Sequence, residues 1–429
     1  MTKSRRNFIS TMSTVTLGGL TLTLFSSPGL LKIKQRLLSF ERLSPQEIAG
    51  DEDFWFHIQQ AYTPTSLFTN LNNGGVSPQP RVVQESFEHY YKLANQAPAY
   101  YMFGEFTRQR ESIKRKLAIL AGCAQEEISL CRNATEALEA VIMGLDLKKD
   151  DEIITTNQDY PTVMAGLDQR ARRDGVKIVK ISIPTPAEDK DEVVKKFKDA
   201  ITPKTKLIVV CHIMYTTGQI MPVREICDMA HERGLEVIVD GAHSFAQLDF
   251  RIPDLHCDYF GTSLHKWLCA PFGCGMLYMK KEKISKVWSL FGSPEDQSGI
   301  MSKFEHLGTR SFPAELAINE AIDFHNGIGI QRKEARLRYL KDYWANAVSG
   351  LPKLKFNTSL KKDFSCGICH FSLDGMTGDA IHKKLFEEHK IYTTLLKHDE
   401  FDGVRVTPHV YTRISDLDRL VEAVKKIAG

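Results

Sequence analysis

The chain has 429 residues, 42% of them hydrophobic, so it can bury a large core and, once any targeting segment is set aside, form two packed units. Lys and Arg number 56 against 53 Asp and Glu, a formal charge of +3, and this balance argues against a nucleic-acid-binding or membrane-surface protein. A small molecule is the expected partner.

Residues 1–31 have the pattern of an export signal. Two adjacent arginines, Arg5 and Arg6, with Phe8 two residues further on, precede the uncharged and mostly apolar stretch 10–31. This arrangement is typical of a twin-arginine signal and predicts recognition by the twin-arginine export machinery and a periplasmic location. No clear small-residue cleavage site follows, so an uncleaved signal that anchors the protein in the inner membrane is the alternative.

Residues 32–75 are predicted to form a helical lead-in, whose amphipathic part begins at Pro45. It ends in a turn rich in Asn and Gly around Asn73 and Gly74, residue types that tolerate positive φ. A long helix is predicted over 104–122. Four of its basic side chains are expected to form a solvated face: Arg108, Arg110, Lys114 and Arg115.

From residue 128 to 263, short apolar runs alternate with amphipathic segments. Strands are expected at 128–131, 152–156, 177–182, 207–212, 237–240 and 258–263, with helices at 164–173 and 192–200 among them. This alternation predicts an α/β fold with a mainly parallel, doubly wound sheet. In such sheets ligands bind beyond the carboxyl ends of the strands.

Two of these strands lead to charged residues. The first ends at Asp240, and the second leads to Lys266. The pair suits pyridoxal 5'-phosphate (PLP), because a lysine amine forms a Schiff base with the aldehyde and an acid keeps the pyridine nitrogen protonated, so that the ring acts as an electron sink. We therefore predict Lys266 and Asp240 to be catalytic. Taken alone, Asp240 also fits an acid that caps a turn, and Lys266 also fits a solvated surface lysine.

A phosphate site is expected where the strand at 128–131 runs into a helix through Asn133, Ala134 and Thr135. Such a junction offers free backbone N–H groups and the positive end of a helix dipole, and the Thr135 hydroxyl adds a donor. Asn133 and Thr135 are also good helix caps, which leaves a structural role as the alternative. Tyr160, near the end of the next strand, can stack on a pyridine ring.

Three segments carry a family resemblance: Asp240-Gly-Ala-His243, Ser263-Leu-His265-Lys266-Trp267 and Ala270-Pro-Phe-Gly-Cys-Gly275. They resemble the central signature of the class V aminotransferase family of PLP enzymes, particularly its branch similar to isopenicillin N epimerase, and the resemblance runs from about residue 72 to the C-terminus. It implies the PLP-dependent transferase fold of type I. A mainly parallel seven-stranded sheet between helices would form a large PLP-binding domain, 76–313, followed by a smaller α+β domain, 314–429.

The resemblance also implies individual roles. His243 would hydrogen-bond the phenolic oxygen of PLP, and Tyr160 would stack on its ring. The phosphate would be held by Ala134, Thr135, Ser263 and His265, and by Thr309 from the neighbouring subunit, which implies a homodimer.

Arg405 would bind the substrate carboxylate, since a guanidinium makes two parallel hydrogen bonds to it. Asn73, with Gly74, would lie near the substrate. Relatives similar to desulfurases carry Asn where this chain has Tyr215, so that contact is not transferred, and Tyr215 is expected to line the site instead.

The implied substrate is an amino acid or a similar amine. Lys266, released when the substrate binds, would remove the Cα proton as general base. Proton return to the cofactor gives transamination, return to the opposite face of Cα gives epimerisation, and loss of a β substituent gives elimination. An aminotransferase or epimerase is favoured, with Tyr215 or Tyr101 as candidate second acids for epimerisation.

A β-lyase acting on a sulfur-containing amino acid is the main alternative, and an exported binding protein without turnover is a further one. Cysteine desulfuration is disfavoured, because residues 391–404 contain no cysteine. The chain has nine cysteines, and the pair Cys366 and Cys369 has redox spacing but leads into an expected strand at 368–373. These two are predicted to be buried structural thiols, and no metal site is expected.

Overall fold

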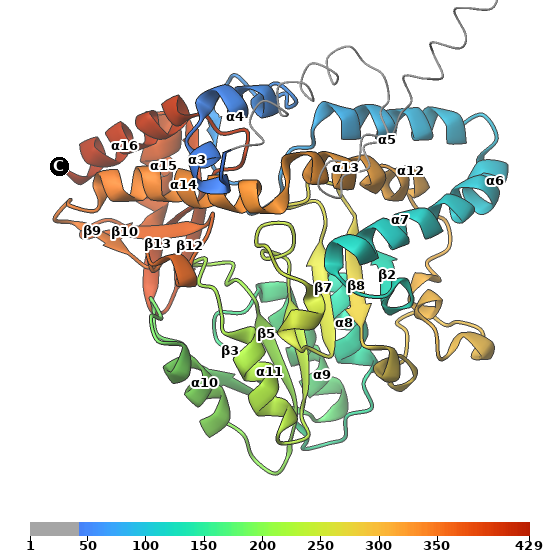
Figure 1. The fold of residues 1–429 in the computed structure, drawn as a ribbon. Coiled ribbons are helices and arrows are strands. Elements are labelled where there is room, and N and C mark those ends of the chain that lie inside the picture. The colour runs from blue at the N-terminus through green and yellow to red at the C-terminus, as the bar shows by residue number, and fades with distance from the viewer. Residues whose placement is uncertain (1–42) are drawn as a thin grey trace, which may run out of the picture.

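A seven-stranded sheet lies at the centre of the larger part of the molecule (Figure 1). The computed structural model describes residues 43–429, so the predicted export signal lies outside it. In spatial order the strands are β2 (Ile128–Cys131), β8 (Gly275–Met279), β7 (Tyr259–Ser263), β6 (Glu236–Asp240), β5 (Thr205–Cys211), β3 (Glu152–Thr156) and β4 (Lys177–Ile181). Only β8 runs against its neighbours, so the predicted mainly parallel seven-stranded sheet is confirmed.

The central strands are buried on both faces, whereas the edge strand β4 is partly exposed. Successive side chains of a strand point to opposite sides of the sheet, so each buried strand contributes to two cores. Ile208 and Val210 of β5 belong to one core, and Leu207 and Val209 belong to the other. Helices α8 (Ala134–Gly144) and α9 (Pro161–Asp174) supply the second core. The first is covered by α7 (Thr107–Ala121), α10 (Lys190–Asp199) and α11 (Val223–His231).

The C-terminal part forms a smaller unit around a four-stranded antiparallel sheet, drawn in orange and red in Figure 1. Its strands, in spatial order, are β12 (Thr394–His398), β13 (Phe401–Val406), β10 (Cys369–Leu373) and β9 (Leu354–Phe356). Helices α14 (Ile330–Val348), α15 (Gly378–Glu387) and α16 (Ile414–Ala428) complete its core. The helices α12 (Phe312–Leu316) and α13 (Ile318–Ile328) pack instead on α7 and on α5 (Arg81–Ala94) of the large unit.

The lead-in is part of both units. Its helices α3 (Pro45–Ala49) and α4 (Glu52–Gln59) confirm the predicted helical segment, and α3 begins with a capping box between Ser44 and Glu47. The following strand β1 (Thr69–Asn70) pairs in parallel with β11 (Ile391–Tyr392), and Leu71 is buried in the core of the C-terminal unit. The division of the chain at residues 75 and 313 stays a prediction.

The prediction of a solvated basic face on the helix at 104–122 is wrong for two residues. The chain is helical there, as a π-helical turn (Tyr101–Phe106) followed by α7, but Arg110 and Lys114 are buried. Arg110 pairs with Glu305 at 3.1 Å and with Glu315 at 2.5 Å, and Lys114 lies 3.6 Å from Glu305. Glu305 and Glu315 follow about 190 to 205 residues later in the chain. Helix periodicity therefore could not reveal that Arg110 and Lys114 have buried acidic partners.

The nine cysteines are free thiols, and Cys366 and Cys369 are buried as predicted. Burial raises the pKa of each of these two thiols to about 12. Within residues 43–429, no helix is both long and apolar enough to cross a membrane.

Candidate active site

The site lies at the carboxyl ends of the central strands. Asp240 is the last residue of β6 and pairs with Cys211 of β5 on one side and with Gly261 of β7 on the other. β7 ends at Ser263, three residues before Lys266. The parallel register therefore brings the predicted acid and the predicted lysine to the same edge of the sheet.

Lys266 faces two aromatic side chains. Its Nζ lies 3.3 Å from Nε2 of His243 and 5.6 Å from the centre of the Tyr160 ring. Burial lowers the pKa of Lys266 to about 8, with Arg405 acting in the same direction and Asp240 opposing. A lysine with this pKa supplies a substantial fraction of neutral, nucleophilic amine near neutral pH.

The Asp240 side chain is buried. One carboxylate oxygen accepts the Ala242 backbone N–H at 2.9 Å. Burial raises the pKa of Asp240 to about 6, while the Ala242 hydrogen bond and the charge of Lys266 lower it. A cationic ring nitrogen placed against this carboxylate favours its ionised form, as Lys266 does.

A second buried carboxylate, Asp159, lies close to Asp240 and was not among the predicted site residues. It accepts hydrogen bonds from the hydroxyls of Thr155 and Thr156 and from the thiol of Cys211, at 2.7 to 2.8 Å. Its charge contributes to the raised pKa of Asp240. Only its place directly after a strand could have suggested it, and that position alone equally indicates a turn.

The residues predicted to hold the phosphate lie around the start of α8. Asn133 caps this helix by accepting the Glu136 N–H, and the Ala134 N–H donates to Oγ of Ser263 at 2.9 Å. Because Oγ of Ser263 acts as acceptor there, its own hydrogen remains available for an anion. The Thr135 hydroxyl lies 3.0 Å from that of Thr162.

His265 is placed differently from Ser263. Its Nδ1 lies 3.1 Å from the carbonyl oxygen of Cys274, so Nδ1 must carry the hydrogen. Burial, and then the charge of Lys266, lower the pKa of His265. A neutral His265 therefore presents Nε2 as an acceptor. It can donate to a phosphate only when the imidazole is protonated, a state that the negative charge of the phosphate favours.

Tyr160 and Tyr215 form an edge-to-face pair beside Lys266. Their ring centres are 5.2 Å apart, with planes at 83°. Tyr160 is 38% exposed, whereas Tyr215 is partly buried. Burial raises the pKa of the Tyr215 phenol, so it is protonated at neutral pH.

Arg405 is a buried cation without an acid. Its Nη1 donates to the backbone oxygen of Tyr215 at 2.5 Å, and its Nη2 lies 3.2 Å from Oδ1 of Asn72 and 3.4 Å from Oγ1 of Thr394. Its Nε has no partner, and no ion pair among residues 43–429 includes it. Burial lowers its pKa to about 10. A carboxylate is the group that this guanidinium lacks.

The side chain of Asn73 is engaged within the protein. Its amide nitrogen donates to the carbonyl oxygen of Thr407 at 2.9 Å, and its oxygen accepts from the Tyr411 hydroxyl at 2.6 Å. Its neighbour Asn72, in the same predicted turn, contacts Arg405 instead. Gly74 also approaches Arg405, since a Cβ there would lie 3.4 Å from Cζ of the guanidinium.

Thr309 is exposed and follows Gly308, which has a φ of 68°. Among residues 43–429, no hydrogen bond or ion pair joins Thr309 to the other predicted site residues. A turn on the surface is compatible with a role toward a second subunit, and that role stays a prediction. Tyr101 lies in the π-helical turn and packs on Phe106.

Residues 69–398 match the family described as aminotransferase class-V. The chain belongs to this family. Isopenicillin N epimerase of Streptomyces clavuligerus is 28% identical over 378 residues, which cover 84% of this chain and 95% of that relative. A probable cysteine desulfurase of Synechocystis sp. is 27% identical over 325 residues, covering 71% and 76%.

Solved structures show the same fold. The apo structure of the cysteine desulfurase from Thermococcus onnurineus NA1 has a TM-score of 0.75 at 21% identity and covers 88% of this chain and 98% of that one. A C-DES mutant with glycine covalently linked to its PLP cofactor has a TM-score of 0.74 at 22% identity, covering 84% and 98%. The predicted type I fold and the predicted PLP cofactor are thus confirmed for this class V chain.

The residues at the strand ends fit PLP. Lys266 has a partly neutral amine for the aldehyde, Asp240 is a buried carboxylate for the ring nitrogen, and Ser263 has a free hydroxyl hydrogen at a helix N-terminus for the phosphate. Gly275 allows β8 to pack closely against the segment that caps α8, since a Cβ there would meet the backbone of Asn133 at 2.6 Å.

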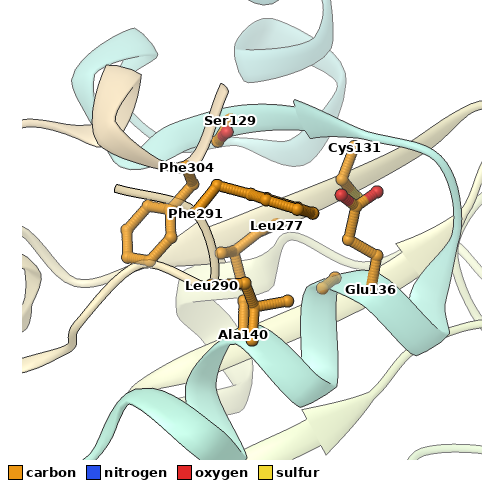
Figure 2. A pocket seen from close by; sticks show the side chains of 9 residues that line it. Ser129, Cys131, Glu136, Ala140, Leu277, Leu290, Phe291 and Phe304 are labelled. Carbon is orange, nitrogen blue, oxygen red and sulfur yellow. The ribbon is translucent and has the colours of Figure 1, made fainter. Parts of the chain in front are cut away.

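A small apolar pocket lies elsewhere, at the edge of the sheet (Figure 2). It is formed by β2, β8, α8 and the segment after β8, and it is lined by Ser129, Cys131, Glu136, Ala137, Ala140, Leu277, Leu290, Phe291 and Phe304. None of these is a predicted site residue. Leu290 and Phe291 are also among the exposed large apolar side chains.

Proposed function

We propose that the protein is a PLP-dependent enzyme of the aminotransferase or epimerase type, acting at the Cα of an amino acid. The observation that carries the proposal is the buried Arg405, a cation that has no acid as a partner. Its charge acts on the pKa of Lys266, as does the charge of the strand-end acid Asp240. A site for amines that have no carboxylate needs no such guanidinium. A site for an α-amino carboxylate does, because the carboxylate fixes the direction of the Cα–H bond.

Each residue then has a defined task. Bound PLP supplies the electron sink that makes the Cα proton removable. Arg405 takes the carboxylate with Nε, and Asp240 stays ionised against the ring nitrogen. The amine of Lys266, whose pKa burial lowers to about 8, would take the Cα proton as general base.

The tyrosine pair supports epimerisation as one outcome. Tyr160 lies across from Nζ of Lys266, and Tyr215 packs against it edge to face. A phenol that is protonated at neutral pH on this side can return a proton to the face of Cα opposite Lys266. The similarity to isopenicillin N epimerase points the same way.

A β-lyase acting on a sulfur-containing amino acid is the second candidate, because Lys266, Asp240 and Arg405 serve it equally well and a probable desulfurase is comparably similar. Among sulfur reactions, elimination fits better than transfer to a protein thiol. The thiol of Cys211, at the end of β5, donates to Asp159, and its burial raises its pKa well above the ordinary value.

A panel of amino acids tests the proposal, with chiral analysis, keto-acid detection and sulfide detection in each reaction. Inverted Cα supports an epimerase, a keto acid with bound aminated cofactor supports an aminotransferase, and sulfide or thiol release supports the lyase. No spectral change with any amino acid would support an exported binding protein without turnover. The Lys266→Ala variant should lose both the visible band of the bound cofactor and turnover.

Solvent deuterium separates the role of the tyrosines. For an epimerase, wild-type protein should exchange the Cα hydrogen of both enantiomers in D2O. Tyr215→Phe and Tyr160→Phe each remove one phenol, and the variant that lacks the second acid should exchange only one enantiomer. Equal exchange of both enantiomers in both variants would exclude the two tyrosines as the second acid.

We also propose that the working form is an exported homodimer. The exposed apolar side chains Leu290 and Phe291, which line the pocket of Figure 2, support a second copy as the partner, as do the exposed Trp288 and Thr309. Light scattering gives the mass. The arginine pair Arg5 and Arg6 supports export through the twin-arginine machinery to the periplasm.

A further inference from the structure

The hydrogen on the His243 ring is determined by a neighbour outside the predicted site. Nε1 of Trp267 donates to Nδ1 of His243 at 3.4 Å. An indole nitrogen is a donor only, so Nδ1 must be an acceptor. A neutral His243 then carries its hydrogen on Nε2, which is the nitrogen 3.3 Å from Nζ of Lys266.

His243 is neutral in this setting. Its side chain is buried, and burial, followed by the charges of Lys266 and Arg405, lowers its pKa well below the ordinary value. A second proton on Nδ1 would also point at the indole N–H. When the Lys266 nitrogen is unprotonated, only one of the three protonation states of this imidazole is therefore compatible with its surroundings.

The indole is itself held in place. Trp267 is fully buried and stacks on His409, with ring centres 5.6 Å apart and planes at 19°. Its backbone oxygen accepts a hydrogen bond from Nζ of Lys333. The backbone oxygen of His243 accepts from Gln247, whose other amide atom accepts the Gly367 N–H at 2.8 Å. These hydrogen bonds fix the backbone of both residues, and the stack on His409 restrains the indole ring.

We propose that Trp267 is a positioning residue that locks His243 in the Nε2–H tautomer, so that this N–H donates toward the nitrogen of Lys266 and the cofactor atoms beside it. The inference rests on Lys266 as the covalent lysine of the proposed enzyme. A fixed donor at this place stabilises an unprotonated nitrogen on Lys266 against a protonated one. Asp240, which attracts the protonated form, acts in the opposite sense, and Arg405 acts in the same sense.

The first test is ¹⁵N NMR of the histidine rings in the full-length protein with PLP, with the His243 signals assigned by their loss in His243→Gln. We expect an unprotonated Nδ1 and a protonated Nε2, with a coupling across the hydrogen bond to Nε1 of Trp267. The reverse tautomer would overturn the proposal. This readout needs no turnover, so it stands even when the proposed reaction proves wrong.

The second test is the pH midpoint of the visible band of the bound cofactor. Trp267→Phe keeps an aromatic ring but removes the N–H, and we expect the midpoint to rise by about 0.5 to 1 pH unit, the worth of one net hydrogen bond. The same substitution in a His243→Gln background should have no further effect. An unchanged midpoint in the single variant would contradict the lock.

Trp344→Phe is the matched control. Trp344 is also fully buried, but its Nε1 has no partner and its ring packs on Phe356 and Phe371 of the C-terminal unit. Its replacement should leave the midpoint unchanged. A similar rise in Trp267→Phe and Trp344→Phe would show general loosening and overturn the proposal. Should Trp267→Phe not fold, the wild-type coupling and tautomer decide the question.

Discussion

The lowered pKa of Lys266 predicts how the cofactor-free protein captures PLP as the pH changes. The pKa is about 8 against an ordinary 10.5, a difference of 2.5, so at pH 7 the neutral amine is about 300 times more abundant than on an ordinary lysine. Only the neutral amine attacks an aldehyde. Capture should therefore accelerate about tenfold per pH unit below 8 and level off above it.

Stopped-flow absorbance after PLP addition, from pH 6 to 10, measures this rate, with a simple amine as reference for the titration of PLP itself. Asp240→Asn should move the midpoint below 8, because the carboxylate favours the protonated amine. Lys266→Ala is the decisive control, since burial also lowers the pKa of Lys333 to about 8. A wild-type midpoint near 10, or unchanged capture by Lys266→Ala, would refute the assignment.

Three other outcomes are expected. Arg405→Lys should raise the KM for amino acids by about tenfold or more, because lysine cannot make two parallel bonds to a carboxylate, and an unchanged KM would place the carboxylate elsewhere. Glu305→Gln should lower the free energy of unfolding in urea by about 3 kcal/mol by leaving buried cations of α7 under-compensated, whereas Glu88→Gln, in an exposed pair, should change it by about 0.5 kcal/mol or less. Replacing Arg5 and Arg6 by lysines should retain the protein in the cytoplasm on cell fractionation, and unaltered periplasmic recovery would contradict twin-arginine export.

The sheet and its ligand-binding edge were predictable because β2, β3, β4 and β5 are each followed by a helix. Such a pattern specifies both the parallel topology and the side on which strand-end residues meet. Asp240 and Lys266 could therefore be paired from the sequence although 25 residues separate them. The antiparallel strand β8 carries no comparable signal, since it follows the site lysine without an intervening helix.

The partners of individual polar groups were less predictable. Asn72 and Asn73 are adjacent and chemically identical, yet only Asn72 contacts Arg405, because the strand-like pairing with Thr407 turns the two side chains in different directions. Likewise, nothing in the helical pattern around Arg110 indicates a carboxylate from a distant segment. Direction within a turn and contacts across the fold are tertiary properties.

The pairing of β1 with β11 limits when this chain can finish folding. Residues 69–74 bond to Lys390, Tyr392 and Thr407, so these contacts cannot form until Thr407 has left the ribosome. The early helices before them rest on α14, which is also synthesised late relative to them. A chain cut short before residue 407 would therefore leave residues 69–74 without part of their bonding partners.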